Sequence, residues 1–227
     1  MDKNTFNHDK FNTWEKCKKR YYFKYVKELK WPELGDNYKL GQSVHALIDY
    51  YLRGLKIDHL LKTADSEIKN HWEAIQNYPI IKNDVIVTEW AFNARIADSK
   101  YWINGRIDAI FYNKEQAKYI IADWKTGQNI PKNPESDFQS MLYLYAFYRG
   151  HKDLKLKLKQ EDIVFQYIKT PNMDNPSPIS FSIEKEKEYE KIFLEKINEI
   201  ENTKVFCKTD PCPLKTHCQY KKLCLSN

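Results

Sequence analysis

Two aspartates and a lysine stand at spacings that suit phosphate-ester chemistry. Residues 106–112 and 117–122 are two short apolar segments separated by turn-forming residues, which predicts a β-hairpin. Asp123 follows the second segment, and Lys125 lies two residues further on, so both side chains project from the same face of a strand. Asp108 in the first segment can meet them across the pair. Two carboxylates beside an ammonium could bind a hard cation and assist hydrolysis of a phosphodiester.

The same residues resemble the ordered motifs of a known nuclease family. Gly105-Arg-Ile-Asp108 followed by Asp123-Trp-Lys125 is similar to the paired motifs of PD-(D/E)xK nucleases. The continuation Lys125-Thr-Gly and the later Gln139-Ser-Met-Leu-Tyr143 narrow the resemblance to the RecB-like branch. The resemblance implies that Asp108 and Asp123 hold Mg²⁺ or Mn²⁺ and that Lys125 is catalytic. It also implies that Gln139 and Tyr143 face the active site.

Three further metal ligands are expected on weaker grounds. His45 is predicted in the first turn of a helix that follows Leu40-Gly-Gln-Ser. A lone helical histidine is more often structural, but the Gly-x-x-x-His spacing from Gly41 resembles the family's metal-binding histidine. Glu89, inside a predicted strand, is either an exposed strand charge or a third acid near the metal. The family also implies that the backbone carbonyl of Trp124 is a ligand.

The predicted elements alternate in the manner of an α/β domain. Hydrophobic periodicity predicts a three-stranded antiparallel meander followed by a helix that Asp137 could cap, another strand and a last helix. The resemblance implies a restriction-endonuclease-like core, in which helices flank a mixed sheet. The expected helices are 6–26, the segment after His45, 64–77, 138–148 and 184–202, and the expected strands are 84–97, 100–112, 117–125 and 162–169. The aromatic face of residues 6–26 could be core or could contact DNA.

The five cysteines form a second candidate site. Four of them fall between residues 207 and 224, and the fifth is Cys17. Zinc would take four thiolates, or three with His217, whereas an iron–sulfur cluster would take four thiolates. Iron–sulfur members of the RecB-like group have one cysteine before the nuclease core and three after it. The resemblance therefore implies a [4Fe–4S] cluster, although the third ligand, expected at Lys215, is displaced. The implied ligands are Cys17, Cys212, Cys218 and Cys224, with Cys207 as the substitute for Cys212.

Length and composition place limits on these expectations. The 227 residues, 42% of them hydrophobic, suffice for one domain with a buried core. We expect a single nuclease domain over 1–227, with 40–202 as its core and 1–30 with 203–227 as a small iron–sulfur lobe. The net charge of +6 is compatible with nucleic acid but is not diagnostic of it. No apolar run reaches the ~20 residues of a membrane span, so we expect a cytoplasmic protein without membrane contact.

The expected activity is that of a metal-dependent DNA exonuclease, with single-strand or flap endonuclease activity as an extension. The resemblance is to CRISPR-associated RecB-like exonucleases and the AddB nuclease domain, and phage or repair nucleases share the layout. DNA ends or single strands are the expected partner, together with a protein of an integration or recombination complex. One alternative is a DNA-binding or complex-forming subunit whose catalysis is dispensable. Another is a non-nuclease metal protein whose cysteine-rich tail binds zinc.

Overall fold

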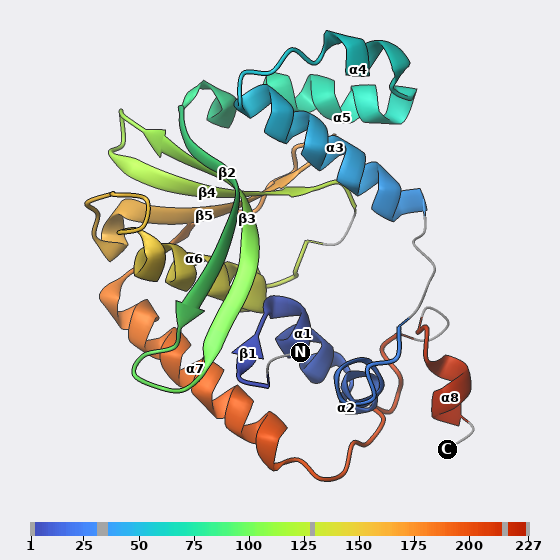
Figure 1. The fold of residues 1–227 in the computed structure, drawn as a ribbon. Helices are drawn as coiled ribbons and strands as arrows, with labels where there is room; N and C mark the ends of the chain where they lie inside the picture. The colour runs from blue at the N-terminus through green and yellow to red at the C-terminus, as the bar shows by residue number, and fades with distance from the viewer. Residues whose placement is uncertain (1–2, 31–35, 128–129, 215–217, 226–227) are drawn as a thin grey trace.

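A six-stranded mixed sheet forms the centre of the molecule in the computed structural model, which describes residues 3–30, 36–127, 130–214 and 218–225 (Figure 1). The expected meander is confirmed, because β2, β3 and β4 pair antiparallel, and β5 then adds parallel to β4. Two short strands at the margins were not predicted. The strands are β1 (Thr5–Phe6), β2 (Asp84–Arg95), β3 (Trp102–Asn113), β4 (Lys118–Lys125), β5 (Ile163–Lys169) and β6 (Ile179–Ser180).

Strand β3 is longer than its partners on one edge. Strand β2 runs along one edge of β3 over nearly its whole length. On the other edge, β4 pairs with residues 109–113 and β1 pairs with residues 102–103. Among the described residues, 104–108 therefore have no strand partner on that edge. A gap of this kind exposes backbone and side chains in the middle of the sheet, where neighbouring helices can reach them.

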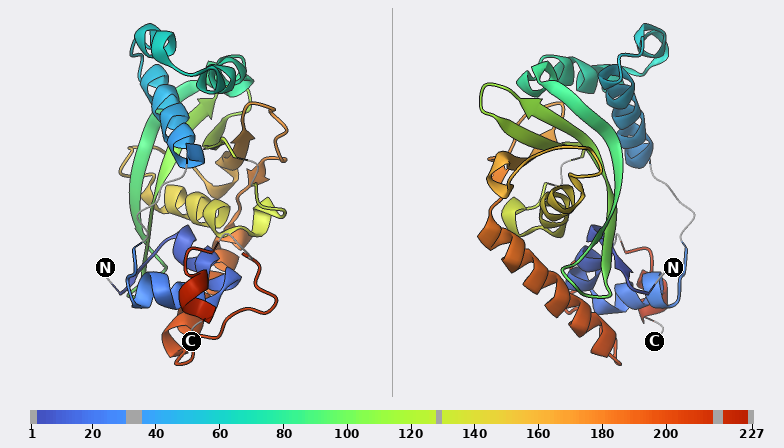
Figure 2. Two further views of the ribbon diagram at one scale, coloured as in Figure 1. Left: turned by 90° about the vertical axis from the view of Figure 1, so that its right-hand side faces the viewer. Right: turned by 60° about the vertical axis from the view of Figure 1, so that its left-hand side comes forward.

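Helices cover both faces of the sheet, as expected. On one face lie α3 (Asp36–Leu52), α4 (Asp58–Thr63) and α5 (Ser66–Gln76), whose apolar residues form a core with Ala109, Phe111 and Trp124. On the other face α6 (Phe138–Gly150) packs directly on the sheet, and α7 (Ile183–Asn202) covers α6 (Figure 2). Short 3₁₀ turns at 79–82, 134–136 and 160–162 connect these elements.

The N-terminal segment is not the single helix that the periodicity predicts. It divides into α1 (His8–Lys16), α2 (Lys18–Tyr21) and a π-helical turn, Tyr22–Val26. Cys17 separates the two helices because its backbone is extended, with φ −168° and ψ 113°. The side chains of Phe11 and Trp14 are buried, so these two aromatics belong to the core.

The tail after α7 returns to the N-terminal segment (Figure 2). The backbone N–H of Lys19 donates to the Cys207 carbonyl at 3.1 Å, and the Tyr220 hydroxyl donates to the Leu29 carbonyl at 2.7 Å. The rings of Phe23 and Tyr220 lie 5.5 Å apart. These contacts join residues almost two hundred positions apart, and the tail ends in α8 (Lys221–Leu225).

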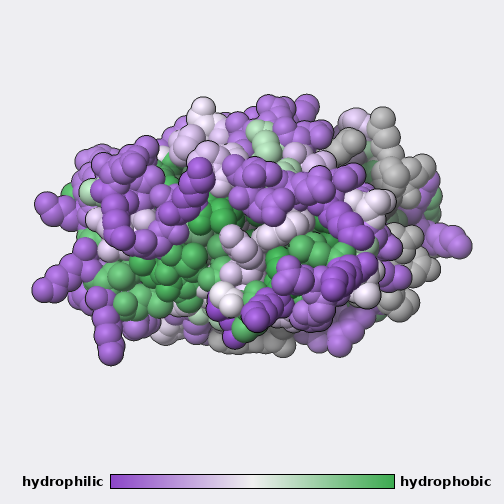
Figure 3. Space-filling view, turned by 90° about the horizontal axis from the view of Figure 1, so that it is seen from above, coloured by the Kyte–Doolittle hydropathy of each residue, from purple (hydrophilic) through white to green (hydrophobic). Residues whose placement is uncertain are grey.

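The outer surface at α4 and α5 is mostly hydrophilic. Figure 3 views this end and shows apolar surface in hollows between polar side chains. One small cavity of about 260 Å³ lies between α3 and α4–α5, lined among others by Leu47, Leu60 and Ile68. Within the described residues, no helix combines the length and apolar character needed to cross a bilayer.

Candidate active site

The two aspartates lie where the β3–β4 ladder ends. Ala109 and Ala122 are the last paired residues, so Asp108 and Asp123 are the first positions beyond the pairing. The backbone N–H of Trp124, no longer bonded to β3, donates to Oδ2 of Asp108 at 2.9 Å. Strand β4 meanwhile stays paired with β5 through residue 125. The fork between β3 and β4 therefore fixes Asp108 from one strand and Asp123 from the other.

A histidine from α3 completes one side of the fork. Nε2 of His45 donates to the Trp124 carbonyl at 2.9 Å, which leaves Nδ1 facing Oδ2 of Asp108 at 3.4 Å. Burial alone would lower the pKa of His45, but Asp108 outweighs it and the net pKa is raised. The prediction that His45 lies in the first turn of its helix was wrong, since α3 begins at Asp36 and His45 is in its middle.

Glu89 joins His45 and Asp108 in one compact group. One ligand atom from each of the three lies within 4.8 Å of the others, and they are the one such group among the described residues. Glu89 has a left-handed backbone with φ 50° inside β2, a conformation that costs a non-glycine residue about 1 kcal/mol or more. Nε of Arg106 lies 2.8 Å from its carboxylate. Burial raises the pKa of Glu89, and Arg106 opposes that rise.

Asp123 lies beside this group rather than in it, and its neighbours are a lysine and an amide. Nζ of Lys125 lies 2.6 Å from Oδ2 of Asp123 and donates to Oε1 of Gln139 at 2.9 Å. Nε2 of Gln139 donates to Oδ1 of Asp123 at 2.6 Å and to the Tyr143 hydroxyl at 3.1 Å. One amide side chain thus bridges a buried carboxylate and an ammonium.

Burial affects the protonation of both Asp123 and Lys125. Burial raises the pKa of Asp123 to about 6, against the lowering effect of Lys125. Burial would lower the pKa of Lys125, but Asp123 and then Asp108 outweigh it, so the ammonium stays charged. Within the described part of the chain, Oδ2 of Asp123 is buried and receives no well-aligned hydrogen bond despite the nearby ammonium. A buried carboxylate oxygen in that condition is suited to a cation ligand.

The donor set fits a hard divalent cation. Two carboxylates and one imidazole form the compact group, the Asp123 carboxylate lies beside it, and oxygen-rich sets of this kind suit Mg²⁺ or Mn²⁺. The Nδ1 lone pair of a neutral His45 would face the Asp108 carboxylate, an arrangement that a proton or a cation between them stabilises. The Trp124 carbonyl accepts the hydrogen bond from His45 in this structure, so the role of this carbonyl as a metal ligand stays a prediction.

Two side chains that the sequence analysis did not single out lie at this end of the fork. Arg106 stands two residues before Asp108 in the same strand and pairs with Glu89. The ring of His8, at the start of α1, meets the ring of Tyr143 edge-on with centroids 6.3 Å apart. Arg106 lies inside the motif and could have been noticed there. For His8 the sequence carries no signal, because about one hundred residues separate it from Asp108.

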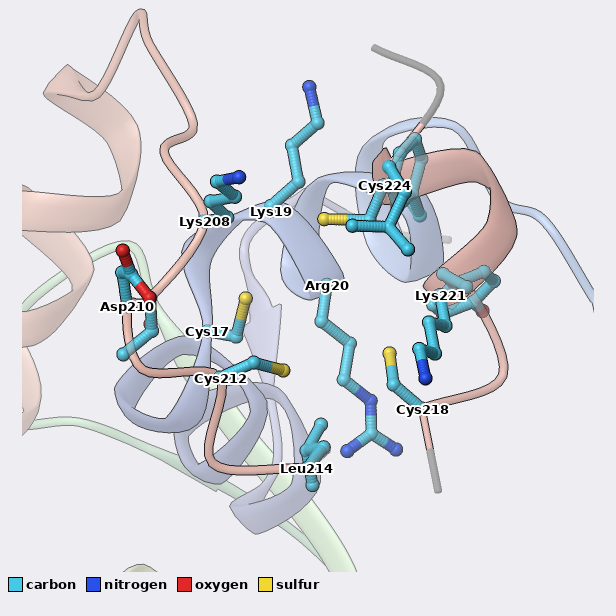
Figure 4. A pocket seen from close by; sticks show the side chains of 14 residues that line it. Cys17, Lys19, Arg20, Lys208, Asp210, Cys212, Leu214, Cys218, Lys221 and Cys224 are labelled. Atoms are coloured by element: carbon cyan, nitrogen blue, oxygen red, sulfur yellow. The ribbon is translucent and has the colours of Figure 1, made fainter. Parts of the chain in front are cut away.

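Four of the cysteines lie near the C-terminal end of α1, away from His8 at its start. Four of the five line one cavity of about 180 Å³, and Figure 4 shows their sulfurs around it. Cys17 is buried, Cys218 and Cys224 are partly buried, and Cys212 is exposed. Burial, Cys17 and Cys218 raise the pKa of Cys224, which reflects the proximity of the three thiols. Cys207 is not among the lining residues, and Lys215 and His217 lie outside the described residues.

Comparisons with known proteins address the whole chain. A family model described as the PD-(D/E)XK nuclease superfamily matches residues 5–225. A solved structure described as a "Putative exonuclease" from Eubacterium rectale is similar in fold, with a TM-score of 0.52 and 9% identity over 93% of this chain and 88% of that chain. The crystal structure of SSO0001 covers 100% of this chain with 88% of its own, at 16% identity and a TM-score of 0.48. No curated protein matches in sequence.

The family match and the geometry concern the same residues. The matched region includes both strands of the fork, the helix that carries His45 and the helix that carries Gln139 and Tyr143. The protein therefore belongs to the PD-(D/E)XK nuclease superfamily, whose members hydrolyse phosphodiester bonds with the help of divalent metal ions.

Proposed function

We propose that the protein is a Mg²⁺- or Mn²⁺-dependent DNA exonuclease of the RecB-like branch, active on DNA ends or single strands. Cleavage within single strands or flaps would be an extension of the same chemistry. The observation that carries the proposal is the fork itself, where Asp108, Asp123 and Lys125 meet beside His45. Buried ionic groups are weak contributors to stability, because apolar replacements are often neutral or stabilising, so this concentration of an acid pair, an ammonium and an imidazole favours a chemical task.

His45, Glu89, Asp108 and Asp123 are the residues that would hold the metal. When bound, a divalent cation polarises the scissile phosphate and lowers the pKa of a bound water. The chain supplies the geometry around it. Trp124 fixes one carboxylate of the set through its N–H and the imidazole ring through its carbonyl. Preset ligands of this kind avoid the free-energy cost of arranging them at the moment of binding.

Lys125 provides a fixed positive charge at the reacting phosphate. Its ammonium is held by Asp123 and Gln139 and lies 5.2 Å from the centroid of the Tyr167 ring. A charge positioned before the reaction stabilises the negative charge that develops on the phosphate oxygens, because little reorganisation is needed. Gln139 holds this ammonium and the Asp123 carboxylate in fixed positions relative to each other.

The surface around α3 supports a single-stranded substrate. Tyr38 is 51% exposed and stands seven residues, or two turns, before His45, so the two side chains share a face of the helix. Exposed aromatic rings stack on the bases of a single strand, and the net charge of +6 favours its backbone. The proposed settings are spacer acquisition in CRISPR systems, recombination or repair, and phage DNA processing. In each setting we expect a protein partner from an integration or recombination complex.

We further propose that Cys17, Cys212, Cys218 and Cys224 hold a [4Fe–4S] cluster. Four cysteines from the N-terminal segment and the tail line one cavity. Four thiolates are the ligand set that such a cluster takes, and zinc, which binds the same set, is the alternative. The role of the cluster would be structural, since it would fasten the tail to the N-terminal helices.

The decisive test is cleavage of end-labelled single- and double-stranded DNA by anaerobically purified protein, with Mg²⁺, Mn²⁺ or EDTA. The comparison variants are Asp123→Ala and Lys125→Ala, each checked for folding by circular dichroism. We expect shortening of the labelled strand that requires metal and is lost in both variants. The label position reports the polarity of digestion.

Other outcomes would redirect the assignment. Metal-dependent cleavage retained in both variants would exclude the proposed site. Folded protein that binds DNA without cleaving it under any condition would favour the DNA-binding or complex-forming subunit. A colourless protein that contains zinc and no iron would instead support a zinc site in the tail.

A further inference from the structure

The start of α1 is anchored against the helix that carries Gln139. Nδ2 of Asn12 donates to Oδ1 of Asp137, the residue that caps α6, at 3.5 Å. The ring of Phe11 stacks on Phe138 with centroids 4.7 Å apart. Both contacts come from one face of α1, and both meet the first turn of α6. The N-terminal helix therefore lies directly beside the candidate active site.

His8 occupies the same face of α1. It stands three residues before Phe11 and four before Asn12, and residues at these spacings are neighbours on a helix surface. Its ring meets the edge of Tyr143, one helical turn after Gln139. Tyr143 bonds Gln139, and Gln139 bonds Asp123 and Lys125, so two side chains separate His8 from the reacting groups.

The ring nitrogens of His8 are available for a hydrogen bond to a ligand. It is partly exposed, and its nitrogens have no hydrogen-bond partner within the described residues. Burial, followed by the positive charge of Lys125, lowers the pKa of His8, so the ring is neutral at pH 7. A neutral imidazole offers one N–H donor. A phosphate oxygen of a nucleic-acid strand is a suitable acceptor for such a donor.

The acidic residues near His8 are already engaged. Asp9 accepts hydrogen bonds from Lys24 and Tyr25, and Asp137 accepts from the Tyr167 hydroxyl and the Gln139 N–H. Asp9 and Lys24 form an ion pair, so their charges offset each other beside His8. The other charged groups that act on the ring are Lys125 and Asp137, which have opposite signs. Both nearby carboxylates are occupied by protein donors, which leaves the N–H of His8 available to a ligand.

We propose that His8 is a DNA-contacting residue, which donates a hydrogen bond to a non-bridging oxygen of the phosphate adjacent to the scissile one. The contact rests on the proposed nuclease function, because it assumes a strand bound at the fork. It assigns a substrate-binding task to the N-terminal helix in addition to its part in the core. Hydrogen bonds to charged groups have effects that correspond to roughly ten- to hundredfold in affinity or rate.

The test compares His8→Ala, His8→Asn and the control His59→Ala, in which an exposed histidine on the distant helix α4 is removed. Two quantities are measured for each protein. The first is the affinity for a fluorescent single-stranded oligonucleotide in EDTA, and the second is kcat/KM for its cleavage with Mg²⁺. The oligonucleotides carry a single neutral methylphosphonate at the scissile position or one nucleotide to either side.

On the unmodified strand we expect His8→Ala to lose about ten- to hundredfold in kcat/KM and to bind more weakly, while His8→Asn recovers part of the loss and His59→Ala changes nothing. The methylphosphonate at the contacted position should abolish the difference between wild type and His8→Ala. A merely structural role would leave that difference unchanged on every strand.

The outcomes separate this contact from the nuclease function. Wild-type protein that binds DNA without cleaving it would refute the nuclease function, while the binding measurements would still decide on the His8 contact. A folded His8→Ala variant that cleaves DNA as fast as the wild type would overturn the contact alone. Equal loss of activity by His8→Ala on all methylphosphonate strands would also overturn the contact alone. Wild-type protein that neither binds nor cleaves DNA would refute both.

Discussion

The side-chain amide of Gln139 donates to the buried carboxylate of Asp123 at 2.6 Å while its oxygen accepts from Lys125. The amide therefore holds both members of a charged pair in one orientation. Removing one partner of a buried charged hydrogen bond typically costs about 1.5–3 kcal/mol, which is roughly ten- to hundredfold in rate.

We accordingly expect Gln139→Ala to lower kcat on single-stranded DNA by about ten- to hundredfold, with a smaller effect on the affinity for DNA. Tyr143→Phe is the matched control, because it removes a hydroxyl bonded to Gln139 but leaves the amide bridge intact. Its kcat should fall by no more than a few-fold. Single-turnover kinetics would check both values, and wild-type kcat in Gln139→Ala would show that the bridge is dispensable.

Glu89 should reveal a conflict between stability and activity. Its left-handed backbone is strained, and asparagine tolerates that conformation better than glutamate. Glu89→Asn should therefore keep or raise the melting temperature while the Mg²⁺ concentration for half-maximal cleavage increases severalfold. Losing the pair with Arg106 should matter little, since that side chain is 64% exposed. An unchanged Mg²⁺ requirement would remove Glu89 from the set of ligands.

Gly105 is constrained by the ring of Phe92 on the neighbouring strand. A Cβ at position 105 would stand 2.6 Å from the tip of that ring, so the ring would have to move. Gly105→Ala should lower the free energy of unfolding by about 1–3 kcal/mol. Phe92→Leu shortens the side chain at position 92. Gly105→Ala should therefore cost less free energy of unfolding in the Phe92→Leu background than in the wild type. Denaturant unfolding of both single variants and the double variant would measure this coupling, and additive effects would contradict the steric explanation.

Acid should weaken the attachment of α7 to the N-terminal helices. Hydrogen bonds from Lys18 and Lys196 lower the pKa of Glu199 to about 2. A depressed pKa means that the folded protein binds the proton less readily than the unfolded chain, so this stabilisation is present above about pH 4.5 and is lost as the pH falls toward 2. Because the side chain is 38% exposed, we expect about 1 kcal/mol or less.

Glu199→Gln provides the comparison for that effect. The variant should be less stable than wild type at pH 6, and the two proteins should converge near pH 2. Urea unfolding at both pH values measures the difference. A gap of equal size at pH 2 and pH 6 would assign the loss to packing rather than to charge.

Matched serine variants distinguish between the two candidates for the remaining ligand of the proposed cluster. Cys212 lines the cavity with Cys17, whereas Cys207 does not. Cys212→Ser should therefore reduce the iron bound per chain and its visible absorbance, while Cys207→Ser should retain both. Iron analysis of anaerobically purified proteins decides between them. Loss of iron in Cys207→Ser alone would exchange the two assignments.

The sequence was sufficient to predict the four long strands of the sheet and the place where Asp108 and Asp123 meet. The strand pattern around Asp108 and Asp123 and the cap at Asp137 depend on local periodicity and short-range hydrogen bonds, which the sequence displays directly. The position of His45 was misjudged, because polar residues before Gly41 hide the first turns of α3. Propensity alone does not show that packing extends a helix through polar residues.

Other features depend on contacts that no local pattern records. The break at Cys17 interrupts a segment whose apolar spacing is helical on both sides. The short strand β1 pairs with residues almost one hundred positions away, and its two residues are too few to show a period. The neighbourhood of His8 and Tyr143 likewise arises only when α1 docks on α6.

One helix connects the two candidate sites. His8 is the first residue of α1 and Cys17 directly follows its last, so nine helical residues, about 14 Å, separate the strand contact from the cysteine cavity. Oxidative loss of the proposed cluster would release the C-terminal end of α1, so that His8 shifts and DNA cleavage slows while every metal ligand at the fork stays intact. Trp14 is buried within α1, so a change in its fluorescence on oxidation, parallel to the loss of cleavage, would report the movement. Unchanged cleavage after complete loss of iron would show that α1 does not couple the two sites.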